Sequence, residues 1–128
     1  MSNKKARQQI MEYVTSNFDQ ITVEPGKIKM NFRCHDNSVH YAKKNKHSKL
    51  AMCVYIDRNC PVIHFVNYNK GRFKDNTLGQ WTRCYDYYFI KWIRDEEMWD
   101  IHDIFTNYRK HLGKQLSWWV RLTSDFRG

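Results

Sequence analysis

The chain has 128 residues, of which 41% are hydrophobic and 16% aromatic, so it predicts one domain over residues 1–128 with a modest core. This composition excludes a globally disordered protein, and no apolar run reaches the roughly 20 residues of a membrane span. The net charge of +9 favours an anionic partner, whether nucleic acid, an anionic membrane or an acidic protein, and does not choose between them.

The N-terminal half predicts two helices separated by a turn and a short extended segment. Residues 4–18 carry apolar side chains every four positions, which indicates an amphipathic helix. We expect no signal peptide before it, because no apolar stretch follows the first basic residues, and we therefore expect a cytoplasmic protein. Glu24-Pro25-Gly26 predicts a turn, and residues 28–32 alternate as an extended segment would. Residues 36–44 are the second predicted helix, and a Lys-rich loop over residues 43–49 follows it.

The C-terminal half predicts an antiparallel meander followed by a helix. The predicted strands are residues 50–56, 61–68, 72–77 and 85–93, with turns at 57–59 and 69–71. Asp95-Glu96-Glu97 is a favourable helix start, and Gly113 is a favourable helix end. Trp118-Trp119 is expected in a second short helix or a packed extended tail. The fold class is therefore α+β, with N- and C-terminal helices and a helix packed on the meander.

Four cysteines, at positions 34, 53, 60 and 84, form no Cys-x-x-Cys pair, which argues against a zinc ribbon or a thioredoxin-like motif. Cys53 and Cys84 have apolar or aromatic neighbours, so we interpret both as small core residues. Cys34 differs because its neighbours are polar and basic. No Gly-rich loop precedes a helix with Lys-Ser/Thr, and we expect neither a cofactor nor a metal.

Cys34, His64 and Asp75 have the residue types and chain order of a cysteine-dependent catalytic site. A thiol needs a base to become a thiolate, and the imidazole needs an acceptor that fixes its tautomer. Cys34 lies near a predicted helix start, where unpaired N–H groups and the helix dipole lower the pKa of a thiol. His64 shares a strand face with Val62 and Val66, where an unpartnered imidazole is costly. The hairpin return brings Asp75 toward His64 if the register holds.

This arrangement resembles the core of the transglutaminase-like branch of the papain-like cysteine enzymes. The resemblance rests on Cys34, on His64, and on Gly71-Arg72-Phe73-Lys74-Asp75-Asn76-Thr77, within residues 30 to 80. It implies a hydrolase or acyltransferase that acts on amide bonds of a protein or peptide through a thioester. By that likeness Cys34 is the nucleophile, His64 the base and then acid, and Asp75 the residue that orients His64.

Several features depart from that family or leave an alternative open. Asn76 rivals Asp75 as the third member, because some papain-like enzymes use asparagine there. Asn31 and the Cys34 N–H are the candidate oxyanion donors, and His35 stands where the family commonly has an aromatic residue. The Lys- and Asn-rich style also resembles small phage-encoded proteins, which implies the cytoplasm of a host cell.

Two other functions compete with catalysis. A non-catalytic module that binds nucleic acid or protein agrees with the net charge, and residues 85–92 carry aromatic side chains suited to stacking on bases. Core packing is the more common role of such a strand. A zinc site built from Cys34, His35, His40 and His64 is the third option, although their spacing matches no standard site.

Overall fold

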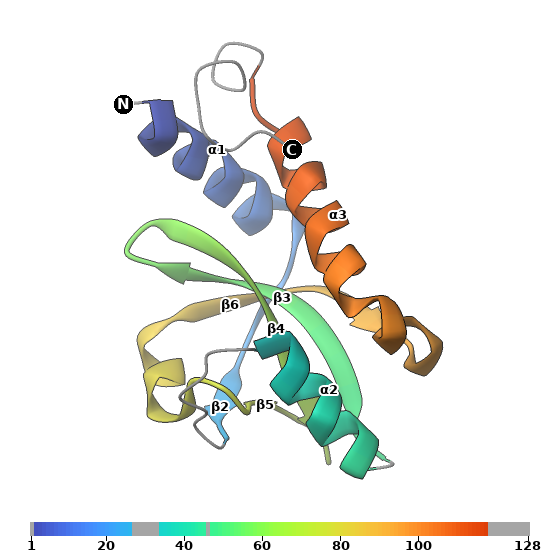
Figure 1. Cartoon of the computed structure of the whole chain (residues 1–128). Helices are drawn as coiled ribbons and strands as arrows, with labels where there is room; N and C mark the ends of the chain where they lie inside the picture. Colours follow the sequence, from blue (N-terminus) through green and yellow to red (C-terminus); the bar gives the residue numbers. More distant parts are fainter. Residues whose placement is uncertain (1, 27–33, 46, 118–128) are drawn as a thin grey trace.

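The computed structural model describes residues 2–26, 34–45 and 47–117, with the side chains of residues 2, 3 and 34–36 left out (Figure 1). It confirms the mixed α+β fold. The predicted extended segment at 28–32, Asn31 and Trp118-Trp119 lie outside the described residues, as do the side chains of Cys34 and His35.

Six strands form one sheet, in the order β1-β6-β3-β4-β5-β2. Their bounds are β1 Gln20–Ile21, β2 Val23–Pro25, β3 Lys49–Asp57, β4 Cys60–Asn69, β5 Arg72–Asp75 and β6 Asp86–Ile93. The meander of β3, β4 and β5 is antiparallel, and β6 returns to pair with the other side of β3. The four predicted strands are thus confirmed, whereas β1 and β2 at the two edges were not predicted.

The sheet curls until its two edges approach each other. The rings of Phe73 on β5 and Trp92 on β6 stack with centroids 5.8 Å apart, although β3 and β4 lie between those strands in the sheet. β1 and β2 lie at opposite edges, yet Ile21 and Val23 are separated by one residue. The chain over residues 20–25 therefore spans the gap between the edges.

Helices cover the outside of this curled sheet (Figure 1). α1 (Ser2–Asn17) and α3 (Ile101–Lys114) pack beside each other, and a hydrogen bond joins the Tyr13 hydroxyl to Nε2 of His111 at 3.1 Å. α2 (Cys34–Lys44) packs lower on the sheet in Figure 1. Side chains alternate along each strand between an outer core, which the helices cover, and an inner core on the other face of the sheet, as a pleated strand requires. The outer core includes Ile10, Val14, Leu50, Met52, Phe65 and Leu112, and the inner one consists of Ala51, Cys53, Val66 and Tyr87.

Both predicted hairpin turns are present and adopt left-handed backbone conformations. Arg58 and Asn59 have φ of 49° and 65°, and Lys70 and Gly71 have φ of 53° and 80°. Two consecutive residues with positive φ match the right-handed twist of the flanking strands. These turns fix the registers of β3 with β4 and of β4 with β5.

Four local predictions were wrong or shifted. The predicted turn at Glu24-Pro25-Gly26 is strand β2 up to Pro25, which is tolerated because β2 is an edge strand and proline has no N–H to donate. Gly113 does not end the last helix; it is buried within α3, which continues to Lys114. Cys84 is exposed rather than in the core, whereas Cys53 is buried as predicted. α2 begins at Cys34, two residues before its predicted start.

Candidate functional site

The most distinctive polar contact inside the sheet joins His64 and Asp75. His64 lies on β4 and Asp75 ends β5, and Nε2 of His64 is 2.6 Å from Oδ2 of Asp75. Asp75 is fully buried and His64 is 3% exposed. The pairing of β4 with β5 sets Lys74 opposite Asn67. Its direction brings Asp75 back toward His64, as the predicted hairpin return requires.

The carboxylate of Asp75 accepts four hydrogen bonds. Oδ2 accepts from His64 and from the Tyr87 hydroxyl, the latter at 2.7 Å. Oδ1 accepts from the backbone N–H groups of Thr77 and Leu78, each at 2.9 Å. A carboxylate offers about four lone-pair positions, so all are used. Full hydrogen bonding makes a buried charge tolerable at this position.

These contacts keep Asp75 ionised at neutral pH. Burial alone raises the pKa of Asp75, but the hydrogen bond and charge of His64 and the donors Leu78 and Tyr87 outweigh burial. The net pKa of Asp75 is below its ordinary value of 3.8. The same carboxylate has the opposite effect on its neighbour: burial first, and then the charge of Asp75, raise the pKa of Tyr87 well above its usual range. Tyr87 therefore stays a donor.

Ionised Asp75 fixes the tautomer of His64. A carboxylate can only accept, so the proton between the two groups belongs to Nε2 of His64. In the neutral ring Nδ1 then carries the lone pair. His64 is also held by edge-to-face contact with Tyr55, at a centroid distance of 5.1 Å. The site therefore presents an oriented imidazole whose basic nitrogen is Nδ1.

Helix α2 is fastened to the same region by two hydrogen bonds from its first turns. Asn37 donates from Nδ2 to Oγ1 of Thr77 at 3.2 Å, and Asn67 donates from Nδ2 to the carbonyl of Ser38 at 2.8 Å. Thr77 lies two residues after Asp75, and Asn67 lies three residues after His64. α2 begins at Cys34, three residues before Asn37 and four before Ser38.

The alternative third member, Asn76, is engaged elsewhere. Its Nδ2 donates to Oδ1 of Asn67 at 2.9 Å, and its side chain is 8% exposed. Asn67 in turn holds Ser38 of α2. The partner of Nε2 of His64 is Asp75, while Asn76 belongs to the connection between α2 and the sheet.

Gly26 allows the chain to pass close to this connection. Its N–H donates to the Asp75 carbonyl at 2.9 Å. A Cβ atom placed on Gly26 would collide with Oδ1 of Asn76 and lie 2.8 Å from the Asp75 carbonyl oxygen. The close approach therefore requires glycine.

The remaining candidate residues are exposed or have side chains outside the described part of the chain. His40 is exposed on α2. Among the residues that the structure describes, no group of three or more His, Cys, Asp or Glu side chains is placed to hold a metal ion. In the same part of the chain, no helix has the length and apolar character needed to cross a bilayer. The aromatic strand β6 contributes to both cores, with Tyr87 buried in the inner one and Ile93 in the outer one, while Trp92 is 39% exposed.

Comparison with known protein families, curated proteins and solved structures finds no match to this chain.

Sequence reasoning did not identify Tyr87, Asn37 or Asn67 as parts of this site. A usable signal for the backbone donors was present, because an aspartate followed by Asn76-Thr77 before a helix is typical of side-chain capping. Here Asp75 accepts from the backbone just before the 3₁₀ helix η1 (Gly79–Cys84). The role of Tyr87 had no local signal, because it depends on β6 pairing with β3, far along the chain.

Proposed function

We propose that this protein is a cysteine-dependent amide hydrolase or acyltransferase of the transglutaminase-like kind. Cys34 is the nucleophile, His64 the general base and then acid, and Asp75 the residue that orients His64. The observation that carries the proposal is the buried 2.6 Å contact between His64 and a fully hydrogen-bonded Asp75. The first turn of α2, the helix that begins at Cys34, is fastened beside this His–Asp pair by hydrogen bonds of Asn37 and Ser38.

The proposed reaction begins with transfer of the Cys34 thiol proton to Nδ1 of His64. The thiolate attacks the carbonyl carbon of a protein or peptide amide, and the carbonyl electrons move to its oxygen. The N–H groups at the start of α2 are suited to stabilise that oxyanion, because the first turn of a helix has no intrahelical acceptors for them. When the C–N bond breaks, His64 returns its proton to the departing amine, and a thioester remains on Cys34.

The second half of the reaction releases the acyl group. Water or an amine attacks the thioester carbon while His64 accepts its proton, and the proton then returns to the sulfur as the C–S bond breaks. Water gives hydrolysis, and an amine gives acyl transfer. Asp75 stabilises the imidazolium in both halves by its charge and by its hydrogen bond to Nε2.

The test is the pH dependence of Cys34 alkylation by iodoacetamide, followed by mass spectrometry. We expect Cys34 to show an apparent pKa below the ordinary thiol value of about 8.5, and to react faster at neutral pH than the exposed Cys84 in the same molecule. Cys53 is buried and should be protected in the native state. These two cysteines are internal references for exposure and for folding.

Matched variants separate a Cys–His pair from mere exposure. His64→Ala should raise the apparent pKa of Cys34 to the ordinary thiol value, whereas His40→Ala, an exposed histidine on the same helix, should leave it unchanged. Alkylation of the normally buried Cys53 would show that His64→Ala does not fold, and His64→Gln then replaces it. An ordinary pKa at Cys34 in the wild type, unaltered by either substitution of His64, contradicts the proposal.

A further inference from the structure

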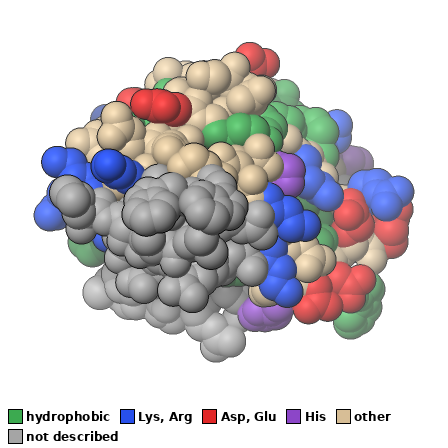
Figure 2. Space-filling view, turned by 90° about the horizontal axis from the view of Figure 1, so that it is seen from above, with side chains coloured by type: hydrophobic (Ala, Val, Ile, Leu, Met, Phe, Trp, Pro, Cys, Tyr) green, Lys and Arg blue, Asp and Glu red, His purple; other side chains and the backbone are tan. Residues whose placement is uncertain are grey.

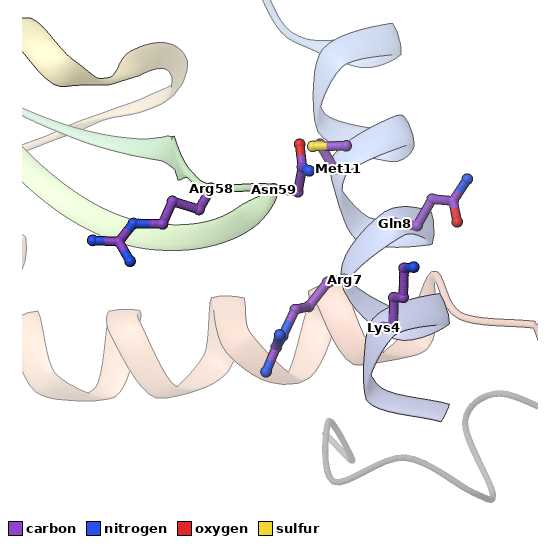
Figure 3. Close-up of a pocket in the computed structure, with 6 residues that line it drawn as sticks. All are labelled: Lys4, Arg7, Gln8, Met11, Arg58 and Asn59. Carbon is purple, nitrogen blue, oxygen red and sulfur yellow. The ribbon is translucent and has the colours of Figure 1, made fainter. Parts of the chain in front are cut away.

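A pocket lies between α1 and the turn that joins β3 to β4, and it shares no residue with the His64–Asp75 site. Its volume is about 500 Å³. Six described residues line it: Lys4, Arg7, Gln8, Met11, Arg58 and Asn59 (Figure 3). Three of these are cations, two are amides and none is a carboxylate.

The two elements contribute different parts of the pocket. Figure 3 shows Lys4, Arg7, Gln8 and Met11 on α1, with Met11 lying near Asn59 of the turn. Arg7 and Arg58 extend to the same side of this view. The left-handed conformation of Arg58 and Asn59 forms the tight corner that presents both side chains.

The positive charge of the pocket is only partly offset by its surroundings. Two carboxylates contact residues of the pocket: Oδ1 of Asp57 lies 3.7 Å from Nε of Arg58, and Oε1 of Glu12 accepts a hydrogen bond from Gln8 at 3.5 Å. The side chain of Arg58 is 96% exposed, so solvent strongly screens its attraction to Asp57. Within the described part of the chain, neither Lys4 nor Arg7 forms an ion pair with a carboxylate, and both line the pocket together with Arg58.

The surface distribution of charge agrees with a local basic site. Figure 2 shows a group of Lys and Arg side chains at the left edge of the face seen from above. That is the side on which α1 begins and the β3–β4 turn lies in Figure 1. At the right edge of Figure 2, Asp and Glu side chains are mixed with the basic ones.

We propose that this pocket binds the phosphate group of a nucleotide, either a free nucleotide or one unit of a nucleic-acid strand. Arginine forks match the geometry of phosphate oxygens, and Lys4 adds a third positive charge. The volume of about 500 Å³ is far larger than a phosphate alone needs and lies within the range of small-molecule sites. Gln8 and Asn59 offer amide donors and acceptors for a base edge, and Met11 offers an apolar contact.

The test measures the binding of two nucleotide probes at about 50 mM salt. A fluorescein-labelled single-stranded oligonucleotide of about 12 nucleotides is followed by fluorescence anisotropy, and ATP by calorimetry. Inorganic phosphate is the competitor in both. Binding of ATP supports a site for a free nucleotide, and binding of the strand alone supports a nucleic-acid site. If inorganic phosphate competes at concentrations similar to those of the nucleotide probes, the pocket does not recognise the nucleotide and the proposal is overturned.

A matched pair of double variants distinguishes the pocket from general charge. Arg7→Gln with Arg58→Gln removes two positive charges from the pocket, and Lys70→Gln with Lys74→Gln removes two exposed charges from the β4–β5 hairpin. We expect the pocket variant to weaken binding at least about tenfold and the hairpin variant less than about threefold, with a salt dependence reduced only in the former. Equal losses in both, or no binding of either probe by the wild type, overturn the proposal.

Discussion

Asn37 in the first turn of α2 donates a hydrogen bond to Thr77, 40 residues further along the chain. Thr77 also donates its own backbone N–H to Asp75. One residue therefore connects the helix that begins at Cys34 with the carboxylate that holds His64. The position of α2 and the state of the His64–Asp75 pair are expected to change together when this connection is altered.

Thr77→Val tests that connection because it removes the hydroxyl while keeping a similar shape. We expect it to destabilise the fold by about 0.5–1.5 kcal/mol, the net value of one hydrogen bond, and to slow Cys34 alkylation several-fold at neutral pH. Thr77→Ser keeps the hydroxyl and should preserve the alkylation rate. Urea unfolding and mass spectrometry measure the two effects. A normal alkylation rate in Thr77→Val would show that α2 does not depend on this contact.

Tyr87→Phe tests the second donor to Oδ2 of Asp75. Loss of a hydrogen bond to a buried charge should cost about 1.5–3 kcal/mol in the free energy of unfolding. Tyr88→Phe is the matched control, because Tyr88 is its neighbour on β6 and lies on the opposite face of the sheet. The control should change stability by less than about 0.5 kcal/mol. Similar losses in both variants would mean that the contact with Asp75 adds little.

Acid should weaken the fold through Asp75. Because its folded pKa lies below 3.8, ionised Asp75 contributes stability fully above that pH, and the contribution is lost as the pH falls through the lowered folded value. The difference in unfolding free energy between wild type and Asp75→Asn should therefore be constant near neutral pH and shrink below about pH 4. Urea unfolding at several pH values measures it.

Asp86→Asn supplies the control for that titration, since Asp86 is exposed on β6. It should differ little from the wild type at every pH. A difference for Asp75→Asn that does not change between neutral and acidic pH would contradict the lowered pKa of Asp75.

Gly26→Ala and Gly71→Ala separate steric collision from backbone strain. The new Cβ at position 26 collides with Asn76, so we expect a loss of about 1–3 kcal/mol and slower alkylation of Cys34. At Gly71 a Cβ meets nothing within 4 Å, but φ is +80°, so the loss should be about 1 kcal/mol with normal alkylation. Faster or equal alkylation in Gly26→Ala would count against a link between this segment and the site.

The sequence predicted the parts of the fold that depend on local patterns. Apolar spacing identified α1 and the strands, and Asn69-Lys70-Gly71 identified the turn that sets β4 against β5. That turn is also why the approach of Asp75 to His64 was predictable, since a short hairpin leaves few registers open.

The features that escaped prediction depend on contacts distant in the chain. β1 and β2 are two and three residues long and have no periodicity of their own, because their partners are β6 and β5. Pro25 and Gly26 look like a turn, yet they lie at an edge where proline is tolerated. Gly113 looks like a helix end, but it is buried within α3.

The way residues 20–25 span the gap between the sheet edges has a consequence for the order of folding. β1 needs β6, and β2 needs β5, so this early segment cannot be fixed until residues near position 88 have been synthesised and placed. Pairings between such distant residues form slowly because their loop-closure entropy is lost first. We therefore expect the meander to form early and the N-terminal segment to join it last, completing the surroundings of Asp75 only in the final step.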